Sequence, residues 1–240
     1  NHHCPQYWLV KTLKQQPEAK TEPWYQDGFT VTPPHRLGRI IRFSKTELIH
    51  LLIGVLLTLA IGFSMPLQSM PELYEFPEIL TSLAVIFAFS FMIHEIAHKS
   101  IAQRYGLWAE FRITILGAII TLLSIMSPFK IIAPGAVMVG GNADKKTIGK
   151  ISITGPLTNI TLALFFLVLT RVLPESIASI FEFGILINSF IAFFNLIPFS
   201  VLDGFKVFSW SKIIWAIAFF PSIALTVLSY AGFLTLQSAI

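Results

Sequence analysis

The chain has 240 residues, of which 54% are hydrophobic and 12% are charged, and its formal net charge is +4. Its mean hydropathy of +0.71 excludes an ordinary water-soluble globular protein and indicates a membrane protein. The single cysteine, Cys4, excludes an internal disulfide, so the fold must depend on packing and on any metal that the chain binds.

The beginning of the chain differs from the rest. It is polar, rich in Pro, Lys and Arg, and without a continuous apolar run, so we expect a polar cytoplasmic segment over 1–46 and a transmembrane domain over 47–240. No secretory signal peptide is visible, and the first transmembrane helix is expected to act as the insertion signal. The opening residues resemble the end of an AN1-type zinc finger, with His2 and Cys4 at its last ligand positions. An ordinary polar terminus explains them equally well, and we assign no metal there.

Long apolar stretches follow, most of them close to the roughly 20 residues that a helix needs to cross a hydrocarbon core of about 30 Å. They cover 48–64, 79–97, 113–127, 151–170, 183–202 and 213–240. We therefore expect an all-α polytopic membrane protein with about five to six transmembrane helices. The last stretch contains Pro221, so it is expected to form a kinked helix or a hairpin.

The positions of Lys and Arg predict which side of the membrane each loop faces, because these residues accumulate on the cytoplasmic side. The segment before the first apolar stretch is basic, whereas 65–78 has glutamates and no Lys or Arg. The first helix is thus predicted to run outward and the second to return inward. If 113–127 crossed fully, the lysines that follow it would lie outside, against this rule. These lysines are Lys130, Lys145, Lys146 and Lys150.

We therefore expect 113–127 to be re-entrant, as its short length also suggests. The third crossing, about 151–172, then leads outward, the fourth, about 183–202, returns, and the last stretch exits again. All of the 17 basic residues except Arg171 lie inside in this topology. The fold prediction is completed by a small re-entrant or strand-like insertion between the second and third full crossings, with the N-terminus in the cytoplasm.

The second helix contains a metal-binding pattern, His-Glu-x-x-His, at His94, Glu95 and His98. Residues four apart lie on one helix face with β-carbons about 5–6 Å apart, so both imidazoles can bind one ion, and this spacing suits zinc. Glu95 can then reach a metal-bound water and take its proton. The alternative is an accidental motif, but ionisable residues in an apolar helix cost roughly 2.5–3.5 kcal/mol each and usually have a function.

Catalytic zinc normally has three protein ligands and one open position, and Asp203 is predicted to be the third ligand. It lies about 20 residues from the outer start of the fourth crossing, while His94 and His98 lie roughly 22–28 Å from the outer end of theirs. This similar depth favours a ligand over a plain loop aspartate. Pro198 is expected to interrupt the helix, and Gly204 to allow a tight backbone that turns the carboxylate inward.

Together these motifs resemble the site-2 protease family of intramembrane zinc metalloproteases, peptidase family M50. The matching segments are His-Glu-x-x-His at 94–98, Gly-Pro-x-x-Asn at 155–159, Asn-x-x-Pro at 195–198 and Asp-Gly at 203–204. The resemblance extends over about 48–210. Phe199 and Ser200 depart from the commonest family pattern but leave the aspartate in place. The zinc-finger-like start would suit an archaeal member.

The resemblance implies that 47–240 is a metalloprotease domain of a multi-pass cell-membrane protein. The charge topology predicts that its active site opens towards the cytoplasm. Zn²⁺ would be held by His94, His98 and Asp203, and Glu95 would be the general base in hydrolysis of a peptide bond. The expected partners are a transmembrane protein substrate and the lipid bilayer, and no nucleic acid.

Two further asparagines and one loop have alternative interpretations. Asn195 is expected to bind the substrate or the oxyanion, or else to make a helix–helix hydrogen bond. Asn159 is expected to pack the third helix against its neighbours. The segment 130–141, rich in Val, Ile and Gly, is predicted to be either a sheet edge that binds unwound substrate through its main chain or a plain connecting loop.

A non-hydrolytic membrane zinc-binding or zinc-transport protein is the alternative function, since His and Asp on facing helices would serve it equally well. Glu95 would then be dispensable, so its position between the two histidines favours the enzyme. A structural or scaffolding membrane protein would leave the buried ionisable residues unexplained.

Overall fold

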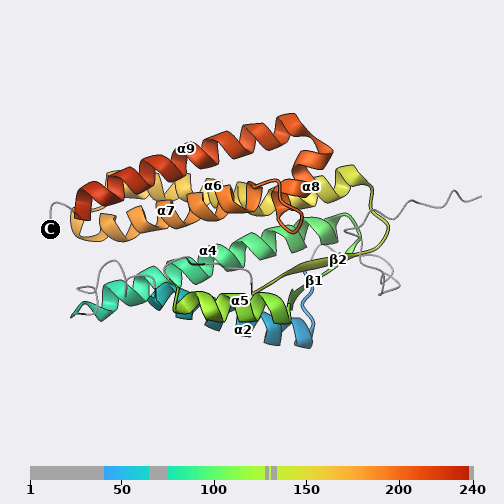
Figure 1. The fold of residues 1–240 in the computed structure, drawn as a ribbon, viewed down its shortest axis with the longest axis horizontal. Coiled ribbons are helices and arrows are strands. Elements are labelled where there is room, and N and C mark those ends of the chain that lie inside the picture. Colours follow the sequence, from blue (N-terminus) through green and yellow to red (C-terminus); the bar gives the residue numbers. More distant parts are fainter. Residues whose placement is uncertain (1–40, 65–74, 128–129, 131–133, 238–240) are drawn as a thin grey trace, which may run out of the picture.

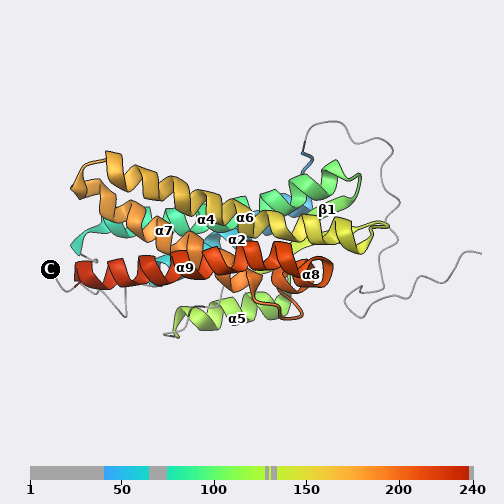
Figure 2. The same cartoon turned by 90° about the horizontal axis from the view of Figure 1, so that it is seen from above.

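The computed structural model describes residues 41–64, 75–127, 130 and 134–237. Within them, 5 helices are long and apolar enough to cross a membrane, and they lie along one common axis (Figures 1 and 2). This confirms the predicted all-α polytopic fold. Residues 1–40 are outside the described part, so the polar segment over 1–46, with His2 and Cys4, stays a prediction.

The long helices are joined by a small insertion and one short helix. The long helices are α2 (Lys45–Ser64), α4 (Pro77–Arg104), α6 (Lys145–Val172), α7 (Glu175–Leu196) and α9 (Lys212–Gln237). The other elements are β1 (Trp108–Ile113), α5 (Ile115–Ile125), β2 (Gly135–Gly140) and α8 (Asp203–Trp210). α2 packs on α4, α4 on α6, α6 on α7 and α7 on α9, so neighbours along the chain are neighbours in space.

Local sequence signals explain where several helices begin and end. The hydroxyl of Ser44 accepts a hydrogen bond from the N–H of Glu47 at the start of α2, and the carboxylate of Asp144 caps α6 by accepting from the N–H of Thr147. α7 ends at Leu196 because the next residue precedes Pro198 and is extended, with φ −58° and ψ 129°. The predicted interruption at Pro198 is therefore confirmed.

The insertion between α4 and α6 contains two strands and one helix. β1 and β2 pair antiparallel, with Phe111 opposite Val137. α5 has 11 residues and a length of about 16 Å, too short for a hydrocarbon core of about 30 Å, which agrees with the prediction that 113–127 does not cross. Of the two forms predicted for 130–141, a strand or a plain loop, the strand is observed as β2, whereas β1 was not predicted.

The described part of the last apolar stretch, 213–237, forms one helix, α9, with Pro221 inside it, rather than a hairpin. α2, α6 and α9 begin, and α4 ends, at the same end of the bundle (Figure 1, right). Most basic residues outside 1–40 lie near these helix ends, as expected if they share one side of the membrane. The assignment of that side to the cytoplasm stays a prediction.

Candidate metal centre

Three side chains from distant parts of the chain meet where α8 approaches α4. His94 and His98 are buried one turn apart on α4, and Asp203 is the first residue of α8. The two Nε2 atoms lie 3.0 Å apart, and Asp203 Oδ2 lies 2.9 Å from His98 Nε2 and 3.4 Å from His94 Nε2. Among the described residues, this group is placed to hold a metal ion, as the sequence predicted.

The spacing and chemistry of this group fit zinc. Tetrahedral ligands with bonds of about 2.0–2.1 Å lie about 3.3 Å from one another, close to the observed separations of 2.9–3.4 Å. Two imidazole nitrogens and one carboxylate also leave one coordination position open, as in catalytic zinc sites. Either a bound cation or a proton on one imidazole nitrogen would stabilise these polar atoms so close together.

Acceptors behind the histidines orient both rings. His94 Nδ1 lies 2.6 Å from Asn159 Oδ1, and His98 Nδ1 lies 2.8 Å from the carbonyl oxygen of Ile151. Because an amide oxygen and a backbone carbonyl only accept, each Nδ1 must carry the hydrogen. Each ring therefore directs its other nitrogen, Nε2, to the common centre.

Asn159 is fully buried in α6 and belongs to a network of polar side chains. Its Nδ2 donates to the carbonyl of Ser90 (3.3 Å) and to Asn188 Oδ1 (2.9 Å), and Asn188 Nδ2 donates to Ser90 Oγ (2.8 Å). The network joins α4, α6 and α7, which confirms the predicted packing role of Asn159. The sequence did not reveal its contact with His94, nor Asn188, although an amide in an apolar helix is a signal of a buried polar contact.

α6 passes close to the ligand atoms at Gly155. A β-carbon on this residue would lie 2.3 Å from His98 Nε2 and 2.6 Å from His94 Nε2, so any side chain would fill the space beside the ligands. Asn159 lies four residues further on the same helix face. The Gly-Pro-x-x-Asn segment thus combines room for the ligand atoms with an acceptor for His94.

The turn between α7 and α8 brings Asp203 to the histidines. A β-carbon at Gly204 would lie 2.1 Å from the carbonyl oxygen of Leu196, so only glycine lets α8 begin this close to the end of α7. The tight backbone predicted at Gly204 is confirmed. Burial acts to raise the pKa of Asp203, but His98 and Lys206 hold the pKa well below its ordinary value of 3.8, so the carboxylate remains ionised.

Glu95 connects the insertion to this centre. It is buried next to His94 on α4, and its Oε2 accepts a hydrogen bond of 3.0 Å from the N–H of Val137 in β2. The predicted general base is thus held by a strand of the insertion. Its catalytic role stays a prediction.

Asn195 lies near the end of α7, and its Nδ2 donates to the carbonyl of Ile191 over 2.9 Å. This hydrogen bond lies within one helix and does not join Asn195 to the histidines or to Asp203. A role in binding the substrate or the oxyanion therefore stays a prediction.

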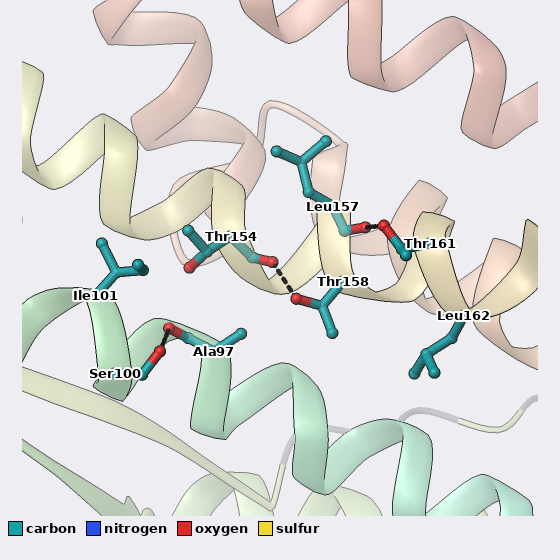
Figure 3. Close-up of a pocket in the computed structure, with 8 residues that line it drawn as sticks. All are labelled: Ala97, Ser100, Ile101, Thr154, Leu157, Thr158, Thr161 and Leu162. Atoms are coloured by element: carbon teal, nitrogen blue, oxygen red, sulfur yellow. Dashed lines mark hydrogen bonds between the residues drawn. The ribbon is translucent and has the colours of Figure 1, made fainter. Parts of the chain in front are cut away.

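A groove of about 370 Å³ lies between α4 and α6 (Figure 3). Its lining includes Ala97 and Thr154, the neighbours of His98 and Gly155 in sequence. The hydroxyl hydrogens of Thr154 and Thr158 are donated to carbonyls of their own helix, so these side chains offer the groove no free donor. The groove adjoins the helix segments that carry the metal site.

One relative, from Methanocaldococcus jannaschii (strain ATCC 43067 / DSM 2661 / JAL-1 / JCM 10045 / NBRC 100440), is named "Putative zinc metalloprotease MJ0611". It is 39% identical to this chain over 188 residues, which cover 77% of this chain and 94% of the relative. No family model matches the chain, and no solved structure matches it. Because identity at this level over nearly the whole relative reflects common descent, the chain belongs to the same protein family as this protein of M. jannaschii.

Proposed function

We propose that the chain is an intramembrane zinc metalloprotease of the site-2 protease type, which hydrolyses peptide bonds of membrane-embedded protein substrates. The observation that carries this proposal is the meeting of His94, His98 and Asp203 at one buried point, with Glu95 beside His94. The kinship with a protein named as a zinc metalloprotease supports the same chemistry.

Zinc bound at this point would supply a Lewis acid that activates water and polarises the scissile carbonyl. The chain's own residues do the remaining work. Asn159 and the carbonyl of Ile151 keep the two Nε2 atoms directed inward. Glu95 takes a proton from the attacking water and then transfers it to the amine that leaves.

The strand β2 offers a place for an unwound substrate. Val137 in β2 is paired with Phe111 in β1, but its N–H donates to Glu95. This N–H therefore points away from β1 and lies on the outer edge of β2. A substrate segment that adds to this edge through main-chain hydrogen bonds would lie beside Glu95. Strand addition would thus unwind the substrate and place its peptide bond at the site in one step.

The site is proposed to open towards the cytoplasm in a multi-pass cell-membrane protein with a cytoplasmic N-terminus. His98 lies about 9 Å along the axis of α4 from Arg104, where that helix ends. The metal centre therefore lies near the end of the bundle at which the basic residues gather, and water can enter over a short distance.

The test is to reconstitute the protein in liposomes with a model single-pass substrate and to measure cleavage and bound zinc. Glu95→Gln is expected to keep zinc and to lower the cleavage rate by about 10²–10⁴-fold, because the proton acceptor is lost. Glu78→Gln, at the exposed start of the same helix, is the matched control and should cleave like the wild type.

Cleavage that survives Glu95→Gln, or that is indifferent to chelators, would refute the mechanism. Zinc flux into the liposomes without cleavage by the wild type would instead support the transport alternative.

A further inference from the structure

A second pair of charged residues is buried next to the insertion. Glu47 near the start of α2 and Lys99 in α4 are 0% and 1% exposed. Lys99 Nζ lies 2.7 Å from both carboxylate oxygens of Glu47. Removing two charges from water is costly, and a buried pair is often neutral or unfavourable for stability. Stability alone therefore does not explain this buried pair, and its function must follow from its other contacts.

Both charged groups also bind the backbone of β1. The N–H of Phe111 donates to Glu47 Oε1 over 3.0 Å, and Lys99 Nζ donates to the carbonyl of Ala109 over 2.8 Å. Alternate residues of a strand direct their N–H and C=O groups to the same edge. The ion pair therefore occupies the edge of β1 that faces away from β2, where another strand would otherwise pair.

His50, one turn after Glu47 in α2, extends this contact. Its Nδ1 accepts a hydrogen bond of 3.2 Å from the N–H of Ile113, which belongs to the same edge of β1 as Ala109 and Phe111. Three alternate residues of β1 are thus held by side chains of α2 and α4. An extended substrate finds this edge occupied and is directed to β2, where the N–H of Val137 is bound by Glu95 and pairing must use the residues beside it.

The sheet is fastened to α4 at both of its outer edges. Lys99 and Glu95 lie four residues apart on one face of α4. Glu95 accepts from Val137 in β2, and Val137 lies opposite Phe111, which the ion pair holds. A shift of β1 would therefore move β2, and with it the N–H that orients Glu95.

We infer that Glu47 and Lys99 are positioning residues, which hold β1 so that β2 is set against Glu95 and is the edge that receives substrate. This inference rests on the proposed function. The pair touches neither the ligand atoms nor the reacting bond, so it acts through the sheet.

The inference is tested with Lys99→Met alone and in combination with Glu47→Gln or Glu47→Leu. Lys99→Met leaves the Glu47 carboxylate buried without its cation, whereas both double variants remove both charges. Only glutamine retains an oxygen that accepts from the N–H of Phe111. Cleavage, bound zinc and hydrogen–deuterium exchange of the segment 108–113 are measured for each purified full-length protein.

We expect Glu47→Gln/Lys99→Met, which keeps the contact with Phe111 but loses the one with Ala109, to retain more cleavage and strand protection than Glu47→Leu/Lys99→Met. Glu47→Leu/Lys99→Met should keep its zinc but exchange faster over 108–113 and lose about 10–100-fold in kcat, because the sheet no longer positions Glu95. Equal cleavage and exchange in the two double variants would overturn the inference, and so would a loss of cleavage without faster exchange.

If the leucine variant does not fold, Lys99→Met is compared with Glu47→Gln/Lys99→Met. The inference predicts that adding Glu47→Gln restores the protection of 108–113 against exchange, and an absence of such rescue would overturn it. Failure of the wild type to cleave any substrate would refute the proposed function, whereas the exchange comparison would still test the positioning of β1.

Discussion

The amide oxygen of Asn159 in α6 accepts the Nδ1 hydrogen of His94 in α4 over 2.6 Å. The same asparagine donates to Asn188 in α7, so three of the long apolar helices together set the orientation of one proposed zinc ligand. An acceptor behind a ligating histidine fixes its tautomer and raises its basicity. Metal binding should therefore depend on a residue that touches no metal.

Asn159→Leu is expected to lower zinc affinity by about 10–100-fold, because the His94 ring loses the acceptor that orients it. Affinity can be measured by competition with a chromogenic zinc chelator. Asn195→Leu is the matched control, since Asn195 donates to a carbonyl of its own helix, and its zinc affinity should not change. Equal losses in both variants would show that helix packing, rather than the contact with His94, is responsible.

Gly155→Ala is expected to abolish stoichiometric zinc binding, because its β-carbon would lie 2.3 Å from His98 Nε2. Gly232→Ala in α9 is the control, since its β-carbon would meet nothing within 4 Å, and it should bind zinc normally. The metal content of both purified proteins is the measurement. Normal zinc in Gly155→Ala would mean that α6 can move away from the histidines.

Removal of the metal should lower the melting temperature of the wild type. A ligand that binds only the folded state stabilises it by about 2.7 kcal/mol at 100 times its dissociation constant. Asp203→Ala should bind zinc weakly, so a chelator should change its melting temperature little. A chelator that lowers the melting temperature of both proteins equally would place the stabilising metal elsewhere.

The capping residue Asp144 predicts a pH dependence of stability. Hydrogen bonds from the side chain and backbone of Thr147, with a smaller effect of nearby lysines, lower the pKa of Asp144 below its ordinary value of 3.8. A carboxyl whose pKa is lower in the folded state stabilises the protein above its unfolded pKa. That contribution is lost as the pH falls through the folded pKa.

The melting temperature of the wild type should therefore fall more than that of Asp144→Asn between about pH 6 and about pH 3, since asparagine caps a helix without titrating. Asp144→Ala should be less stable than both near pH 6 because it lacks a cap. Identical pH profiles for the wild type and Asp144→Asn would contradict this role of the carboxylate.

The predicted topology can be tested by cysteine labelling in a Cys4→Ser background. Lys145→Cys at the start of α6 should react with a membrane-impermeant maleimide only from the cytoplasmic side, because α5 does not cross. Arg171→Cys near the end of that helix should react only from outside. Labelling of Lys145→Cys only from outside and of Arg171→Cys only from the cytoplasm would refute the assigned orientation. Labelling of both cysteines from the same side would refute the crossing of α6.

The sequence by itself determined the long helices and the proposed ligands. Hydropathy runs and helical spacing are local properties, so they predicted the crossings and placed His94 and His98 on one helix face. The distribution of Lys and Arg predicted the topology. That topology predicted that Asp203 lies at a depth in the membrane similar to that of His94 and His98. Pro198 and Gly204 also acted locally, since one prevents helix and the other permits close backbone approach.

Only the tertiary structure decided which groups from different helices meet. β1 has 6 residues and carries both Glu110 and Arg112, so its pattern is too short and too polar to predict a strand paired with β2. The contacts of Asn159 with His94, of Gly155 with the ligand atoms and of Glu47 with Lys99 join residues about fifty or more positions apart. The rotation and spacing of packed helices determine such contacts, and these depend on the whole bundle rather than on any local pattern.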